Sequence, residues 1–216
     1  MTELAASRYP APTLVRGANV TAKAGLLILV AFAVAFPDLS HLRDKAAGMR
    51  AIGYPMLAFA VPLVWVLFWR ERVSFPWLAD LMVTITCFTD ILGNQMNLYD
   101  TVVWFDDWMH FMNTGLLAAA VILLTMHSSS SFGAVLERAL AFGATAAIGW
   151  ELAEFFAFIR FSPERHNGYA DTLGDLTLGT LGAIAAAAVI HAPWRQGKLS
   201  SATPLLIARV DGRGPA

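Results

Sequence analysis

The chain has 216 residues, of which 57% are hydrophobic and 14% are charged, and its formal net charge is -1. Soluble domains usually carry about 25% charged residues, so this composition excludes an ordinary soluble domain and indicates a protein that crosses a membrane several times. A net charge near zero without a basic stripe excludes a nucleic-acid partner, and the single cysteine excludes an internal disulfide. Membrane lipids are the expected partners, and the sequence leaves protein partners open.

The first two apolar runs each carry a feature that needs an explanation. The first follows Lys23 and is short for a membrane span, which needs about 20 residues. Its Ala-Phe-Ala triplet at 31–33 also fits a cleaved secretory signal, so the mature protein has five or six spans. The second run contains Pro55 and Pro62, and we expect neighbouring helices to satisfy the backbone carbonyls that these prolines leave free.

Four further apolar runs follow, and the whole pattern predicts an all-α polytopic membrane helix bundle with about six transmembrane helices. The tails are expected at 1–22 and 193–216, on either side of a bundle at 23–192. The six spans are expected at 24–37, 51–69, 77–98, 104–126, 140–159 and 172–191.

Lysine and arginine residues in the short loops predict the orientation, because they concentrate on the cytoplasmic side. With six spans, ten of them lie on the side of the two termini and five lie on the other side. Both termini are therefore predicted to be cytoplasmic, with the protein in the inner membrane of a bacterial cell.

Polar residues gather at the predicted outer ends of the last four spans. Ionisable groups are costly inside a bilayer and usually mark a functional site. They occur here in pairs three or four residues apart, so each pair shares one face of its helix. The pairs are Asp90 with Asn94, Asp107 with His110, Glu151 with Glu154, and Asp171 with Asp175.

Acidic groups outnumber basic groups in this outer region. Arg160, Arg165 and His166 are among the few groups near enough to offset them. Like charges in a low-dielectric site cannot all ionise, so either some carboxylates are protonated or a cation is bound. Carboxylates with a histidine suit a divalent metal ion. We predict such an ion with the ligands Asp107, His110, Glu151, Glu154 and Asp175, supported by the polar residues Asp90, Asn94, Asp106 and Asp171.

Several of these residues also have a simpler interpretation. Asp106, Asp107 and Asp171 lie where helices are expected to begin, and carboxylates are favourable at helix N-termini. His110 would also fit as a hydrogen-bonded core residue. Glu151 lies more than one turn inside its span, where helix capping does not account for it. On the sixth span, small residues follow Asp175 and predict that another helix packs closely beneath this carboxylate.

The polar patterns resemble those of the YjdF-like bacterial inner-membrane proteins and, more distantly, those of VanZ-like proteins. The resemblance covers residues 90–188 and implies a multi-pass topology and a polar site, but no particular reaction. In place of the glutamine and asparagine common in VanZ-like proteins, this chain has Glu154 and Gly179. The patterns are Asp90-x-x-Gly93-Asn94, Phe105-Asp106-x-x-x-His110, Trp150-Glu151-x-x-Glu154 and Asp171-Thr172-x-x-Asp175.

The sequence supports three functions and does not decide whether the protein is an enzyme. In the leading hypothesis the metal site opens to the outer face and polarises an ester or phosphoryl oxygen of a lipid or envelope-derived substrate. The alternatives are a proton- or cation-coupled transporter and a structural membrane subunit. Asp80 and Glu137 are interpreted as boundary residues, so we expect no acidic path that continues to the cytoplasmic side.

Overall fold

The computed structural model describes residues 12–42, 45–157, 159–161 and 168–205, and the fold of this part of the chain is all-α. One π-helical segment, η1, covers Trp65–Trp69, and one 3-10 turn, η2, covers Ile159–Phe161. The α-helices are α1 Thr13–Ala35, α2 Ala47–Ala58, α3 Ala60–Val64, α4 Trp77–Gln95, α5 Leu98–Thr101, α6 Phe105–Thr125, α7 Phe132–Ala157 and α8 Gly168–Arg195.

Four of the described helices, α1, α6, α7 and α8, are long and apolar enough to cross a membrane. The bent pair formed by α2 and the segment 60–69 is a fifth candidate. These helices confirm the predicted all-α membrane bundle. The third predicted span corresponds to α4, which is 19 residues long. Helix α4, which carries Asp80, Asp90 and Asn94, is not among these five candidates, and its crossing of the membrane stays a prediction.

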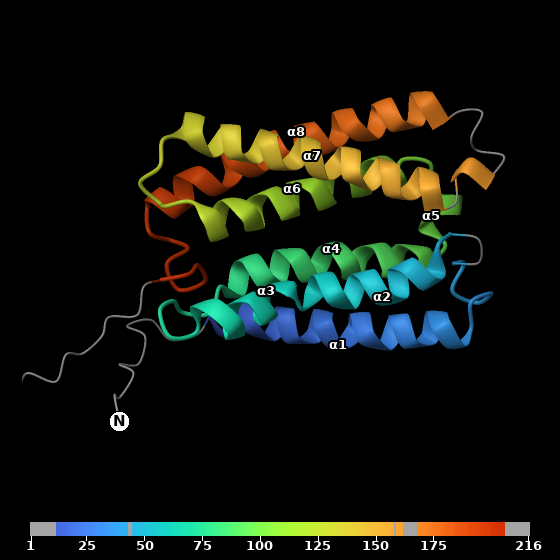
Figure 1. Cartoon of the computed structure of the whole chain (residues 1–216), viewed down its shortest axis with the longest axis horizontal. Helices are drawn as coiled ribbons and strands as arrows, with labels where there is room; N and C mark the ends of the chain where they lie inside the picture. Colours follow the sequence, from blue (N-terminus) through green and yellow to red (C-terminus); the bar gives the residue numbers. More distant parts are fainter. Residues whose placement is uncertain (1–11, 43–44, 158, 162–167, 206–216) are drawn as a thin grey trace, which may run out of the picture.

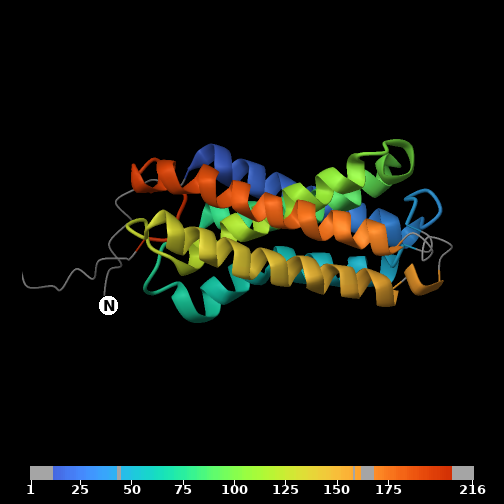
Figure 2. The same cartoon turned by 90° about the horizontal axis from the view of Figure 1, so that it is seen from above.

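The long helices lie side by side along the longest axis of the molecule (Figures 1 and 2). One group consists of α1, α2 and α4, and the other consists of α6, α7 and α8; α4 packs against α6 and joins the two groups. The end of α1, the start of α2 and the short helix α5 lie together at one end of the bundle, on the right in Figure 1. We call this end the acidic end.

The boundaries of the predicted tails and spans stay predictions, although the helices themselves have defined limits. The helix that contains the first predicted span begins at Thr13, within the segment assigned to the N-terminal tail. Residues 1–11 and 206–216 lie outside the described residues, and the cytoplasmic location of both termini stays a prediction.

The bend in the second span has a clear backbone cause. Helix α2 ends at Ala58, and the axis turns by 43° before the segment 60–69. Pro62 has no N–H group, so it cannot donate the helical hydrogen bond to the carbonyl of Ala58. The ammonium of Lys23 on α1 donates to that carbonyl instead. A neighbouring helix therefore satisfies the carbonyl that Pro62 leaves free, as predicted.

Small residues bring α6, α7 and α8 into close contact. A Cβ atom at Gly182 on α8 would overlap the carbonyl oxygen of Phe111 on α6. One at Gly179 would lie 3.2 Å from the Cβ of Ala147 on α7. The predicted close packing beneath Asp175 is therefore confirmed, and Asp175 is buried in the bundle.

Candidate functional site

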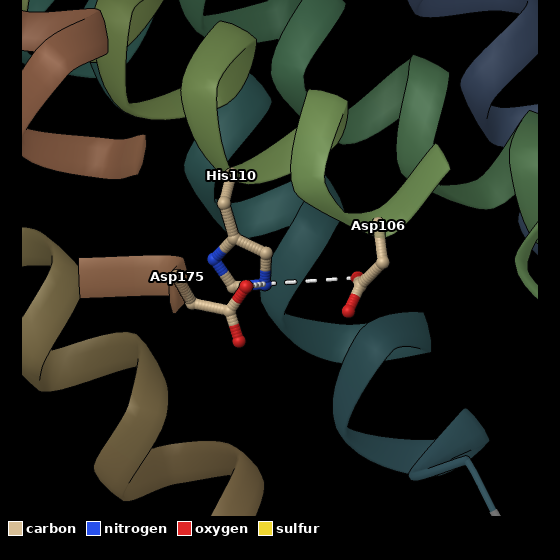
Figure 3. Close-up of side chains that lie close together, drawn as sticks. All are labelled: Asp106, His110 and Asp175. Atoms are coloured by element: carbon tan, nitrogen blue, oxygen red, sulfur yellow. Dashed lines mark ion pairs between the residues drawn. The ribbon is translucent and has the colours of Figure 1, made fainter. Parts of the chain in front are cut away.

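The imidazole of His110 lies among carboxylates from three helices near the acidic end. Its Nε2 atom is 3.6 Å from Oδ1 of Asp106, one turn earlier on α6, and 3.6 Å from Oδ1 of Asp175 on α8. Figure 3 shows the ring between these two carboxylates. Its Nδ1 atom is 3.7 Å from Oε1 of Glu151 on α7. One buried ring thus faces acidic groups on both of its nitrogen atoms.

These distances are close to those between ligands of a metal ion. Ligand atoms about 2.1 Å from an ion are separated by about 3.0–3.4 Å in octahedral or tetrahedral geometry. The potential ligand atoms form two overlapping sets, and within each set all the atoms lie within 4.8 Å of one another. The first set is Asp106, His110 and Asp175, and the second is His110, Glu151 and Glu154. We call these five residues the acidic cluster.

The local sequence explains how each helix contributes to this cluster. Asp106 and His110 are four residues apart, so they lie one above the other on α6. The close backbone contact between Gly182 and Phe111 holds α8 against this face of α6. Further along, Gly179 on α8 lies against Thr114 on α6. Asp175 and His110 each precede these residues by one turn on helices that run in the same direction, so Asp175 lies at the level of His110 (Figure 1).

The acidic cluster differs in one member from the predicted ligand set. His110, Glu151, Glu154 and Asp175 are brought together, whereas Asp107 is exposed and belongs to neither set of ligand atoms. Asp106, which was predicted to have only a supporting role, takes its place. Successive residues on a helix are rotated by about 100°, and this rotation leaves Asp107 exposed while Asp106 faces His110.

Hydrogen bonding within the cluster is incomplete. Oε2 of Glu151 accepts a hydrogen bond from Oγ1 of Thr172 at 3.0 Å. Oε1 of Glu151 is buried and accepts no hydrogen bond among the described residues. The distances around His110 exceed those of normal hydrogen bonds. A buried carboxylate oxygen without a donor is costly, so this position favours a bound cation or proton.

Asp90 lies beside the cluster but has its own partners. Its Oδ2 atom accepts from Nε of Arg50 at 3.1 Å and from the hydroxyl of Tyr54 at 2.6 Å. Its Oδ1 atom accepts from the hydroxyl of Tyr99 at 2.7 Å. Burial and the nearby Asp90 carboxylate raise the pKa of Tyr99, which therefore stays protonated and remains a donor. Asn94, also predicted as a supporting residue, donates to the backbone carbonyl of Asp90.

Arg50 is the most important residue that the sequence prediction missed. It directly precedes the second predicted span, 51–69, and so falls in a predicted outer loop, but α2 begins at Ala47 and buries Arg50. Its Nη2 atom is 3.8 Å from Oε1 of Glu154, so the guanidinium links Asp90 to the acidic cluster. The spacing of four between Arg50 and Tyr54 was the available signal that both lie on one face of a helix.

A cavity of about 120 Å³ connects Asp90 and its partners with the acidic cluster. Its walls include Arg50, Tyr99, Asp106, His110 and Glu154. This volume is enough for several water molecules or a small polar group. Potential ligand atoms therefore border a space large enough for a small polar group.

The remaining predicted groups near this end lie at its edge or outside the described residues. Asp171 is exposed in the first turn of α8. The guanidinium of Arg160 lies over the ring of Phe156, 5.6 Å from its centroid. Arg165 and His166, which were expected to offset the acidic charge, lie outside the described residues.

Asp80 lies in the first turn of α4, at the boundary position that was predicted, but it is buried between helices. Its Oδ1 atom is 3.0 Å from the ammonium of Lys23, and its Oδ2 atom accepts from Nδ2 of Asn19 at 2.7 Å. Lys23 also donates to Oγ1 of Thr84 at 2.6 Å. We call these four residues the lysine cluster. Glu137, by contrast, is exposed on α7.

A family model described as "Predicted membrane protein (DUF2238)" matches residues 22–196. The chain belongs to this family. The match extends from within α1 to the end of α8, so the DUF2238 region contains the whole acidic cluster. No curated protein and no solved structure matches the chain. The resemblance of this DUF2238 protein to YjdF-like and VanZ-like proteins therefore stays a prediction.

Proposed function

We propose that this DUF2238 protein binds a divalent metal ion in the acidic cluster and uses it to act on a lipid or envelope-derived substrate. The charge imbalance around His110 carries the proposal. Carboxylates from α6, α7 and α8 approach the two ring nitrogens at 3.6–3.7 Å. Such groups repel one another in a low-dielectric site unless they are protonated or bind a cation. A divalent ion is the cation that this combination of ligands suits.

Asp106, Asp175 and Nε2 of His110 form the ligand set that we favour. Histidines that bind metals usually donate their other ring N–H to a carboxylate, which fixes the tautomer and the ring orientation. Glu151 lies beside Nδ1 and has an oxygen available to accept that proton. Glu154 is then left to pair with Arg50. The second set, with His110, Glu151 and Glu154, is the alternative location for the ion.

The surroundings of the cluster support chemistry on a polar group at a membrane surface. Asp106 and Asp175 lie near the starts of their helices, and Glu151 lies near the end of α7. The site is therefore close to one end of the bundle, and we infer that this end lies where lipid headgroups meet hydrocarbon. A bound metal ion would polarise an ester or phosphoryl oxygen in the adjoining cavity, and Arg50 would supply a second positive charge for that oxygen.

Metal analysis of the detergent-purified protein tests the first part of this proposal. The wild-type protein is expected to retain close to one divalent ion per chain after dialysis, and Asp175→Asn is expected to lose it. Asp100→Asn is the matched control, because Asp100 lies in an exposed pair with Lys45, away from the cluster. Substoichiometric metal in the wild-type protein, with a melting curve that chelation does not change, would contradict the metal site.

Coupled transport of protons or cations is the second candidate function. Burial of Asp80 with Lys23 favours it, because buried ionisable groups then occupy both ends of α4. An enzyme is expected to convert a lipid substrate without an ion gradient, whereas a transporter is expected to produce a flux in vesicles that Glu151→Gln and Glu154→Gln abolish. If neither response is found, the role that remains is that of a structural membrane subunit.

A further inference from the structure

An apolar groove lies between α2 and α7, on the side of the bundle away from α8. It has a volume of about 200 Å³ and is open along one side. Met49 and Leu57 are exposed large apolar residues along its α2 wall. The remaining residues of its lining that are not charged are Ala46, Gly53, Tyr54, Trp150, Ala153 and Ala157.

Two side-chain contacts separate this groove from the cavity beside the acidic cluster. Nη2 of Arg50 is 3.8 Å from Oε1 of Glu154, and the rings of Tyr54 and Trp150 stack with their centroids 6.5 Å apart. All four residues line both the groove and the cavity. These four side chains therefore form the boundary between the two spaces.

The length and direction of the groove match one leaflet of a bilayer. On α2 it extends from Ala46 at the acidic end to Leu57. Eleven helical steps of about 1.5 Å span about 16 Å, and half of a hydrocarbon core of about 30 Å is about 15 Å. A chain in the groove would therefore begin near the membrane surface and end near the bilayer midplane.

We propose that one acyl chain of a phospholipid occupies this groove and brings its phosphate to the metal site. This inference rests on the proposed function, because the metal ion supplies the positive charge that a phosphate requires, and Arg50, which is paired with Asp90, adds a hydrogen-bond donor. The Arg50–Glu154 distance of 3.8 Å is longer than a hydrogen bond. A phosphate oxygen would take this place beside the guanidinium with Glu154 protonated, because two anions would otherwise repel each other there. A transmembrane helix, about 10 Å wide, would not fit in a groove of this volume.

Photocrosslinking in lipid nanodiscs tests the assignment. The probe is a phosphatidylglycerol with a diazirine halfway along one acyl chain, and mass spectrometry maps the modified residues. We expect the label to concentrate on Met49, Leu57 and Ala153. Gly53→Trp should remove most of this label, because its side chain would fill the groove. The metal content of Gly53→Trp should equal that of the wild-type protein.

Gly48→Trp is the matched control. A Cβ atom at Gly48 or Gly53 would meet no atom within 4 Å, so neither substitution is expected to prevent folding. Gly48 lies on α2 but does not line the groove, and its substitution should leave the labelling unchanged. Labelling spread evenly over the lipid-facing helices, or unchanged in Gly53→Trp, would overturn the groove assignment even if the protein binds metal. If the label concentrates in the groove of a wild-type protein that binds no metal, the proposed metal function and the phosphate assignment are overturned. The assignment of an acyl chain to the groove would then still hold.

Discussion

Two polar clusters lie near opposite ends of α4, and they differ in how completely their groups are paired. In the lysine cluster, one carboxylate and one ammonium form an ion pair at 3.0 Å. Both oxygens of Asp80 have partners, and Lys23 also donates to Thr84 and to the carbonyl of Ala58. In the acidic cluster, several carboxylates surround one imidazole at distances beyond hydrogen bonding.

The difference separates a structural role from a binding role. A buried network whose members are all paired fixes the positions of its helices, and here it holds α1, α4 and the bend after α2 together. A buried cluster with an excess of one charge is stable only with an added proton or ion. The lysine cluster therefore supports the fold, whereas the acidic cluster has the properties expected of a site.

Loss of one partner in the lysine cluster should cause the largest change in stability. Lys23→Met leaves Asp80 buried without its ammonium partner, and breaking a buried ion pair typically costs about 3–5 kcal/mol. The thermal midpoint in detergent should fall sharply. The double variant Lys23→Met with Asp80→Leu should recover part of the loss, because no unpaired charge then remains. Equal stability of the single variant and the wild-type protein would contradict the structural role of the cluster.

Loss of His110 should affect stability only through metal binding. A ligand at 100 times its dissociation constant stabilises the folded state by about 2.7 kcal/mol. Wild-type protein should therefore melt at a lower temperature after chelation, whereas His110→Gln should show no effect of the chelator. The lysine-cluster variant Asp80→Asn should keep its response to the chelator despite its lower midpoint. A chelator effect that persists in His110→Gln would place the ion elsewhere.

Asp106 and Asp107 provide a comparison between adjacent residues of the same chemistry. Asp106→Asn should weaken metal affinity by at least about tenfold. Even the loss of a residue that only hydrogen-bonds to a metal ligand typically weakens metal affinity by about that factor. Asp107→Asn should leave the affinity unchanged, because Asp107 is exposed and belongs to neither set of ligand atoms. Isothermal titration of the metal-depleted variants measures both constants. The reverse order of effects would restore the ligand set predicted from sequence.

The sequence predicts the features of this fold that depend on local patterns. Apolar runs indicate membrane helices, because the length of a span is set by the bilayer. The small residues that follow Asp175 predict the close packing of α8, and Pro62 predicts that a neighbouring helix must satisfy a free carbonyl. Each of these properties is determined by residues within a few turns of one helix.

The details that the sequence could not predict depend on contacts between distant segments. The burial of Asp80 requires Lys23, which is 57 residues away in the chain. Arg50 could be recognised as a partner of Asp90 only once α2 was known to begin at Ala47. The choice between Asp106 and Asp107 depends on a rotation of one residue, about 100°, and hydrophobicity alone does not fix that rotation.

The exposed pair of Lys45 and Asp100 should give the smallest effect. Its atoms are only 2.7 Å apart, but Asp100 is half exposed, and surface ion pairs usually contribute about 0–1 kcal/mol. Asp100→Asn should therefore change neither the midpoint measurably nor the metal content. The Lys45–Asp100 pair is shorter than the buried Lys23–Asp80 pair but is expected to contribute less stability. The comparison therefore tests whether burial matters more than distance. A large loss of stability in Asp100→Asn would show that Lys45 holds the start of α2, and with it Arg50, against the acidic end. Metal affinity measured in the same variant would then determine whether that position of Arg50 matters to the site.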